Sequence, residues 1–317
     1  MLAQATVNGI LLGGLYGLAT VGFSMVWGVM GVINLAHTSF IMLGAYVTYF
    51  LFEKLGMDPI VSMPFAMAAM FVLGYAIQRF ILNGVIRTSL LLSLVVTFGI
   101  DLVLTDATVL AFTSDVRSVN ASYASTSVAL FGTLVPVVRL VAAGLSLVLG
   151  IAFFVFLRSA SLGQAILATA LDREMSNLMG INPQKVFALT AGAGAALAGA
   201  AGSLSSMLFP VSPTMGVSFL AAVFVITVLG GIGSVEGCIV AGFLYGLVQA
   251  WAAYFLGTSY QEIVAFALFL AVLILRPQGL FGRAFFGEHA WARRLYSNGR
   301  PRCWCSDRWC GSLSRWD

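Results

Sequence analysis

Apolar residues fill this chain in long runs that short polar stretches separate. A transmembrane helix needs about 20 mostly apolar residues to cross roughly 30 Å of hydrocarbon, and runs of that kind recur from Val7 to Leu275. Hydropathy divides the chain into nine apolar segments, each of which predicts a membrane helix. The segments are residues 5–27, 38–52, 60–83, 89–113, 134–157, 186–209, 217–230, 238–256 and 261–275.

The seventh segment, 217–230, is shorter than a bilayer is thick and ends in Gly230-Gly231-Ile232-Gly233. We expect it to be a tilted span or a re-entrant element buried among other helices. The predicted fold is an all-α polytopic transmembrane bundle of about nine segments, with eight or ten as alternatives. We expect one transmembrane domain over residues 1–284 and a cytoplasmic tail, disordered or atypical, over residues 285–317.

The composition is not that of a soluble globular protein. Hydrophobic residues make up 60% of the chain and charged residues 9%, which leaves too little polar surface to coat a soluble globule. The formal net charge is only +4, and the basic residues are scattered or lie in the tail, so we expect no nucleic-acid partner. The first apolar segment lacks the cleavage pattern of a signal peptide, so we expect it to stay as a helix.

Lysine and arginine are retained on the cytoplasmic side of short loops, so their distribution predicts an orientation. An external N-terminus and a cytoplasmic C-terminus place most basic residues in cytoplasmic loops. Those loops then hold Arg79, Arg87, Arg158, Arg173, Lys185 and the basic residues from Arg276 onward, whereas Lys54, Arg117 and Arg139 fall outside. Nine spans are consistent with this orientation.

The sixth apolar segment carries small residues at spacings of three and four. Among them are Gly194, Ala198, Gly199 and Gly202. Lipid tails are as apolar as leucine, so membrane helices associate through close approach of their backbones at small residues. We therefore expect this helix to press against a neighbour. Ordinary tight packing is the simpler interpretation, and a moving gate helix is the alternative.

A polar stretch, residues 159–184, connects the fifth and sixth segments. Residues 163–179 contain no proline and no glycine after the first, and Asn182-Pro183 closes the stretch. This pattern predicts a short helix at the membrane surface. Such a helix can dock on another protein, and a solvated amphipathic connector is the alternative.

Several blocks of the sequence together resemble the integral membrane permeases of ABC importers for branched-chain amino acids and related small polar molecules. The resemblance covers residues 8 to about 284. The blocks are Asn8-Gly9 through Gly17, Gly31 to His37, Gly44-Ala45-Tyr46, Asp172-Arg173-Glu174, Gly180 to Asn182, Gly230 to Ser234 and Arg276 to Gly282.

The resemblance implies that the loop between segments five and six is a cytoplasmic coupling helix, which sits in a cleft of an ATPase subunit. The matching residues here are Ala170, Asp172, Arg173, Glu174, Gly180 and Asn182. Closure of two ATPase subunits would push paired coupling helices and rock the bundles between outward- and inward-facing states. The permease itself then needs no nucleotide, and the sequence indeed has no Gly-x-x-x-x-Gly-Lys-Ser/Thr loop.

The same resemblance implies the partners and the location of the chain. The implied partners are cytoplasmic ATP-binding subunits, a second permease subunit and an extracytoplasmic substrate-binding protein. A paralogue is the expected second permease, and a homodimer is the alternative. The implied location is the lipid of the cell inner membrane, which the chain crosses several times. Branched-chain amino acids are the default substrate, and other amino acids, amides and urea stay open.

Polar residues inside membrane segments are expensive to bury, and they usually face a bundle interior or an aqueous cavity. The residues that stand out are Asn34, His37, Asp101, Asp106 and Arg139. For Asp101, a role in the pathway is weighed against a structural hydrogen bond. Asn34 and His37 share a face if residues 31–38 are helical, but that stretch equally fits a turn. Helix capping or backbone hydrogen bonding is the simpler role for both, and lining the substrate path is the alternative.

No cluster of reactive side chains points to catalysis or to a metal. No nucleophile or second acid is expected beside Asn34 or His37, so we do not expect an enzyme. The tail carries Cys303, Cys305 and Cys310, but a fourth zinc ligand is not evident, so neither a metal nor another cofactor is predicted. The main alternative to an importer permease is a secondary transporter or channel coupled to ions through Asp101 or Asp106.

Overall fold

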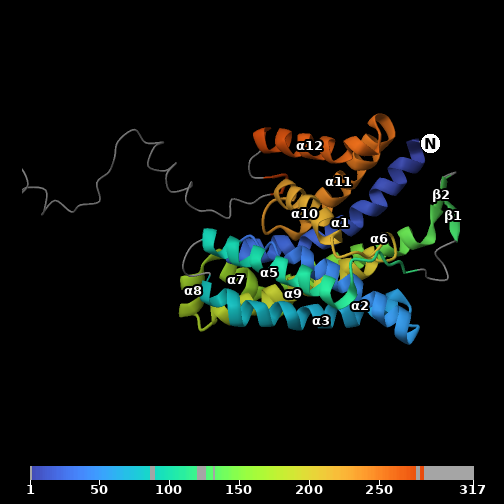
Figure 1. Cartoon of the computed structure of the whole chain (residues 1–317). Helices are drawn as coiled ribbons and strands as arrows, with labels where there is room; N and C mark the ends of the chain where they lie inside the picture. Colours follow the sequence, from blue (N-terminus) through green and yellow to red (C-terminus); the bar gives the residue numbers. More distant parts are fainter. Residues whose placement is uncertain (1, 86–89, 120–125, 131–132, 276–278, 282–317) are drawn as a thin grey trace, which may run out of the picture. The chain divides into compact units, whose positions relative to one another are not determined.

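A computed structural model describes residues 2–85, 90–119, 126–130, 133–275 and 279–281 (Figure 1). The predicted tail, residues 285–317, lies outside the described residues. The helices are α1 (Leu2–Met30), α2 (His37–Leu55), α3 (Pro59–Ile77), α4 (Asn83–Val85), α5 (Leu90–Phe112), α6 (Val137–Ser159), α7 (Ser161–Leu171), α8 (Arg173–Leu178), α9 (Pro183–Ser205), α10 (Met215–Gly230), α11 (Val235–Leu256) and α12 (Gln261–Leu275). A π-helical stretch, Gln78–Leu82, joins α3 to α4, and a 3-10 turn, Thr258–Tyr260, precedes α12.

Each predicted apolar segment coincides with a helix, which confirms a polytopic helical bundle. Within the described residues, seven helices are long and apolar enough to cross a membrane: Leu2–Met30, Pro59–Val85, Leu91–Phe112, Val137–Ser159, Pro183–Ser205, Val235–Leu256 and Thr258–Leu275. Two predicted spans, α2 and α10, do not meet this standard, and the count of nine membrane segments stays a prediction.

The connection before α6 is not helical, contrary to an all-α fold. Strands β1 (Ser127–Leu130) and β2 (Thr133–Pro136) pair antiparallel, with Ser127 opposite Pro136. An isolated antiparallel bridge also joins Arg117 to Val211. Hydropathy gave no signal for these pairings, because each strand spans only four residues.

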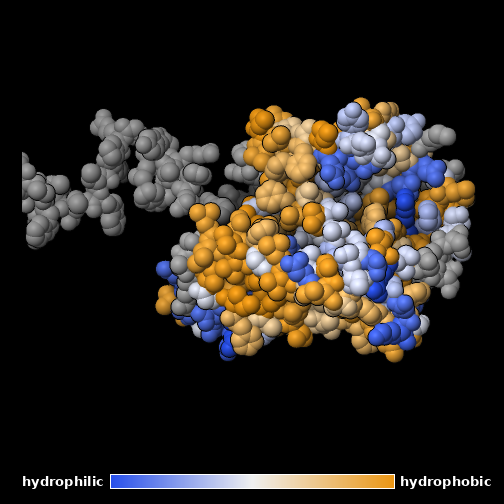
Figure 2. Space-filling model, in the orientation of Figure 1, coloured by the Kyte–Doolittle hydropathy of each residue, from blue (hydrophilic) through white to orange (hydrophobic). Residues whose placement is uncertain are grey.

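Two helices form the centre of the bundle. Helix α1 packs mainly against α11, α9 and α6, whereas α9 packs against α3, α2 and α1. In their most apolar stretches, 78% of α1 and 83% of α9 are buried, against 11% of α5 and 6% of α12. The outer helices therefore present their apolar residues outward. Figure 2 shows such residues gathered over the face that carries α5, as expected for a surface in contact with lipid.

Helix α2 begins beside the middle of α1 rather than at its end. The chain turns back after Gly31, whose φ is +66°, and residues 32–36 are not helical. The Nε2 atom of His37 lies 3.0 Å from the carbonyl oxygen of Ala19. Ala19 precedes Met30, the last residue of α1, by about 16 Å along the helix axis at a rise of ~1.5 Å per residue. The turn predicted as one alternative for residues 31–38 is therefore present over residues 31–36, whereas His37 and Thr38 already belong to α2.

Helix α10 begins at the same level as α2. A β-carbon on Gly216 would lie 3.2 Å from the carbonyl oxygen of Thr38, so the first turns of the two helices touch. With 16 residues, α10 is about 24 Å long, which is shorter than the ~30 Å hydrocarbon core. Both helices thus begin inside the bundle, near the middle of α1.

Candidate functional site

The polar stretch between α6 and α9 folds into two short helices instead of the single helix predicted for residues 163–179. Asp172 separates α7 from α8 with an extended backbone (φ −153°, ψ 113°). Its carboxylate accepts hydrogen bonds from the backbone N–H groups of Glu174 (2.9 Å) and Met175 (3.0 Å). Aspartate favours this capping position because its side chain replaces the missing helical acceptor. The prediction of one continuous helix is wrong for this reason.

One side of this stretch is an exposed apolar surface. Large apolar side chains around α8 are mostly exposed, namely Leu171, Met175, Leu178 and Met179. Glu174 is also exposed, and Ala170 is partly buried. Gly180 follows α8 with φ +83°, a conformation that glycine adopts without strain, and no atom of the described residues lies within 4 Å of the position of a β-carbon there. Contiguous exposed apolar side chains mark surfaces that bind other proteins.

The opposite side of α8 is attached to the bundle through Arg173. Its guanidinium donates hydrogen bonds to the carbonyl oxygens of Met30 and of Val29, the latter at 3.4 Å. It also lies over the ring of Phe187 in α9, 5.1 Å from the centroid. Burial lowers the pKa of Arg173 from its ordinary value, by desolvation. A cation at the last carbonyl groups of a helix is favourable, so Arg173 ties α8 to the end of α1.

Asn182 connects this stretch to α9. Its side-chain oxygen accepts hydrogen bonds from the backbone N–H groups of Gln184 (3.0 Å) and Lys185 (3.4 Å), and Pro183 occupies the first helical position. Asparagine before proline is a favourable helix start. The residues predicted for the coupling loop therefore lie in one segment at the end of the bundle where α1 ends and α9 begins.

The polar residues predicted for the substrate path lie around the first turn of α2. Asn34 and His37 are buried, and the backbone N–H of His37 donates a hydrogen bond to the backbone carbonyl oxygen of Asn34 (3.2 Å). Asp101, in α5, accepts a hydrogen bond from the Ser39 hydroxyl. The Asn34 side-chain oxygen is buried and has no hydrogen-bond partner among the described residues. These contacts are those of the simpler structural interpretation, and the roles of the three residues in transport stay predictions.

The other two polar residues lie apart from this group. Asp106 is exposed in the second half of α5, and Arg139 is partly buried in the first turn of α6. Neither makes a hydrogen bond or ion pair with Asn34, His37 or Asp101 among the described residues.

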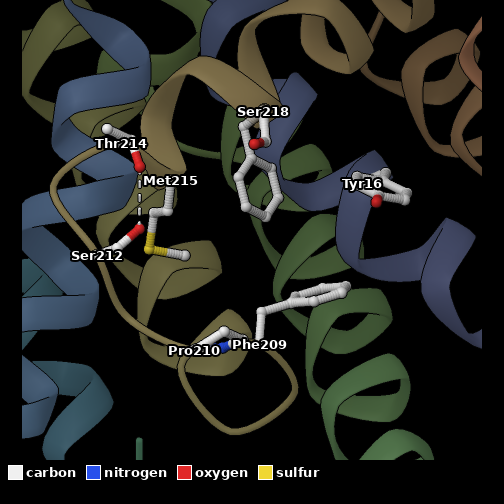
Figure 3. A pocket seen from close by; sticks show the side chains of 8 residues that line it. Tyr16, Phe209, Pro210, Ser212, Thr214, Met215 and Ser218 are labelled. Carbon is white, nitrogen blue, oxygen red and sulfur yellow. Dashed lines mark hydrogen bonds between the residues drawn. The ribbon is translucent and has the colours of Figure 1, made fainter. Parts of the chain in front are cut away.

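A hollow of about 260 Å³ lies beside the first turn of α10 (Figure 3). Its lining residues are Tyr16, Phe209, Pro210, Ser212, Thr214, Met215, Ser218 and Phe219. The Tyr16 ring stands across the hollow from Met215 and Ser212, and the Ser212 and Thr214 hydroxyl oxygens are 3.2 Å apart. Sequence reasoning missed this site, because aromatic residues in apolar segments are more often part of a packed core.

Residues 5–273 match the family model described as "Branched-chain amino acid transport system / permease component". This chain belongs to that permease family. The match spans α1 to α12 nearly completely, so it includes the α7–α8 stretch, the beginning of α2 and the hollow.

Relatives of this permease carry consistent names. Two of them are the high-affinity branched-chain amino acid transport system permease proteins BraD of Pseudomonas aeruginosa and LivH of Escherichia coli. Each is 32% identical to this permease, and the aligned region covers 88% of this chain and 95% of the relative. A probable branched-chain amino acid transport permease protein of Methanocaldococcus jannaschii, LivH, is 23% identical, and the aligned region covers 84% of this chain and 88% of that protein. These relatives are transport permease components and not enzymes, which confirms the expectation of a non-enzymatic chain.

The small residues predicted to pack in the permease lie on three sides of α9. Gly194 faces Gly22 of α1, Gly199 faces α3 at Ala66, and Gly202 faces α2 at Ile41. Ala198 is fully buried. A β-carbon at Gly202 would lie 2.0 Å from the Ile41 carbonyl oxygen and 2.9 Å from the Ala45 nitrogen, which is closer than packed atoms allow.

Proposed function

We propose that this permease forms the translocation pathway of an ATP-driven importer of branched-chain amino acids, with ATP hydrolysis in separate cytoplasmic subunits. The observation that carries the proposal is the α7–α8 stretch, which combines an exposed apolar surface with an attachment to α1 inside a chain of the permease family. Relatives named for branched-chain amino acids support the substrate class.

In this proposal α8 and the residues around it are the coupling element. The exposed side chains of Leu178 and Met179 dock into a cleft of the ATPase subunit, as Asp172 and Gly180 fix the two ends of α8. When the ATPase subunits close on ATP, the push reaches Arg173 and, through its hydrogen bonds, the end of α1. Since α1 packs against α9 and α11, a displacement of α1 moves the centre of the bundle.

The distribution of charge supports a cytoplasmic position for the α8 end. Basic side chains at this end are Arg79, in the π-helical stretch Gln78–Leu82, and Arg158, Arg173 and Lys185, in α6, α8 and α9. Lys54, Arg117 and Arg139 belong to the opposite end, where Ser203 of α9 donates a hydrogen bond to the Pro59 carbonyl oxygen. By the positive-inside rule, this distribution supports an external N-terminus. The remaining partners are an external substrate-binding protein and a second permease, a paralogue or an identical copy.

The test is reconstitution of the permease with its ATPase, second permease and binding protein in proteoliposomes. We expect uptake of radiolabelled L-leucine that requires ATP and stops when the ATPase subunits are omitted. Uptake that proceeds without the ATPase subunits and follows an imposed ion gradient would overturn the proposal. ATP-dependent transport of an amide or urea in place of leucine would leave the importer proposal standing and would change only the proposed substrate.

A substitution at Asp101 tests the importer against the alternative of a transporter coupled to ions. Asp101→Asn keeps an oxygen that accepts the Ser39 hydrogen bond but removes the carboxylate charge. We expect ATP-dependent leucine uptake to stay within about twofold of the unchanged protein, because a neutral acceptor loses only part of the hydrogen-bond energy. Uptake rates in the same proteoliposomes measure this. Complete loss of uptake in an inserted and folded Asp101→Asn protein would support coupling to ions through this carboxylate.

A further inference from the structure

The hollow beside α10 is walled mainly by aromatic and apolar side chains. Phe209, Met215 and Phe219 form this wall together with Pro210, and the Phe209 and Phe219 ring centroids are 6.5 Å apart. Tyr16 continues the wall from α1, with its ring 5.8 Å from that of Phe219. Such a surface binds an apolar side chain by removing it from water.

Hydroxyl groups form the polar part of the hollow. The Tyr16 and Ser218 hydroxyls make no hydrogen bond among the described residues, and the side-chain hydroxyls of Ser212 and Thr214 hydrogen-bond only to each other there. Among the described residues, no charged side chain lines the hollow. A ligand held here is therefore expected to be neutral overall, with groups that bind hydroxyls at one side and an apolar group at the other.

The start of α10 adds a positive potential at the polar side. Thr214 precedes the helix, but its side chain does not cap the first N–H groups of α10. The backbone N–H groups of Met215 and Val217 donate to the carbonyl oxygens of Ser212 and Thr214 (both 3.1 Å), so it is the dipole of α10 that attracts a negatively charged group to this end. Helices that begin within the membrane bring this potential to the centre of a bundle, and α10 begins beside the middle of α1.

We propose that this hollow holds the amino acid during translocation. The apolar side chain of the substrate packs against Phe209, Met215 and Phe219, and its carboxylate lies at the hydroxyl groups and the start of α10. This inference rests on the proposed function, because it assigns a binding site to that same transport. The substrate class is an amino acid with a small branched apolar side chain, since about 260 Å³ is less than the ~300–1,000 Å³ of pockets for drug-sized ligands.

The first test narrows the hollow. Ser218 lines it and is exposed, so Ser218→Leu adds bulk without disturbing a packed contact. Val217 is its neighbour on α10, is exposed and does not line the hollow, which makes Val217→Leu the matched control. The readout is the ratio of maximal uptake rates for L-leucine and L-valine, with each substrate saturating the binding protein.

We expect Ser218→Leu to lower the leucine-to-valine ratio about tenfold, because one methylene group in an apolar pocket changes selectivity ~10–200-fold. Val217→Leu should leave the ratio unchanged. An unchanged ratio in an active Ser218→Leu transporter overturns the inference, as does an equal change in both variants.

The second test does not depend on transport by the altered protein. Ser218→Cys and, as control, Val217→Cys are made in the assembled transporter with Cys303, Cys305 and Cys310 changed to serine. Each is then labelled with a membrane-impermeant methanethiosulfonate reagent. We expect L-leucine at about ten times its dissociation constant to slow labelling of Ser218→Cys about tenfold, by occupying the site. Labelling of Val217→Cys should not change.

Labelling of Ser218→Cys that proceeds equally fast with and without L-leucine overturns the inference. If the unaltered transporter imports leucine while both tests fail, the site is wrong and the proposed function stands. If the unaltered transporter does not import leucine, the proposed function fails on its own measurement.

Discussion

Gly202→Ala is expected to prevent most of the permease from accumulating in a folded form. The added β-carbon would lie 2.0 Å from the Ile41 carbonyl oxygen and 2.9 Å from the Ala45 nitrogen, and both atoms belong to the backbone of α2. Backbone atoms cannot move aside as a flexible side chain can, so α9 and α2 must separate. Overpacking costs ~1–3 kcal/mol, occasionally more, and we expect the upper part of that range. The ~1 kcal/mol gained from the helix propensity of alanine does not offset it.

The measurement is the yield and thermal unfolding of the purified protein in detergent. Gly144→Ala is the matched control, since within the part of the chain that the structure describes no atom lies within 4 Å of a β-carbon at Gly144 in α6. We expect the yield and the unfolding temperature of the control to equal those of the unchanged protein or to exceed them slightly. Equal unfolding temperatures for the two variants would show that α9 and α2 can separate at little cost, which favours the moving-gate interpretation of α9.

Arg173→Ala is expected to lower leucine uptake strongly while the ATPase subunits still bind and hydrolyse ATP. The substitution removes the hydrogen bonds from α8 to the Met30 and Val29 carbonyl oxygens and the contact with Phe187. It leaves the exposed apolar side of α8 unchanged. A hydrogen bond from a charged group contributes about 1.5–3 kcal/mol, so we expect uptake per ATP hydrolysed to fall at least about tenfold.

The ratio of uptake to ATP hydrolysis measures coupling, because simple loss of protein lowers both quantities together. Arg173→Lys is expected to restore part of the ratio, since lysine keeps the charge but not the planar fork of donors. Lys185→Ala is the control for a basic side chain at the same end, where Lys185 is exposed. If Arg173→Ala lowers uptake and ATP hydrolysis in parallel, Arg173 acts in docking or folding and not in transmission.

The helical nature of the chain could be predicted closely because hydropathy is a local property. The apolar run 186–209 coincides with α9 at Pro183–Ser205, and the break at Asn182-Pro183 is the actual start of that helix. The helix within residues 163–179 was predicted less well. Its interruption depends on one side chain, since Asp172 satisfies two backbone N–H groups and thereby begins a new helix.

Part of the candidate site could be predicted because the residues lie close together in the sequence. The α7–α8 stretch is one continuous segment, so its motif could be recognised without knowledge of the fold. The contact of Arg173 with Met30 could not, because the two residues are 143 positions apart and no local pattern relates them. The hollow was missed for the same reason, since Tyr16 meets Phe219 only after α1 and α10 pack together.

The sequence by itself determined the class of the protein, the approximate limits of its membrane helices and its family, because these depend on hydropathy and on short motifs. Only the tertiary structure decided where along α1 the other helices begin. The contact of His37 with Ala19, and that of Gly216 with Thr38, place the starts of α2 and α10 inside the bundle. The depth at which a helix begins within the bundle is set by packing between segments that are distant in the sequence. Hydropathy is an average over one segment and contains no information about which other segments pack against it.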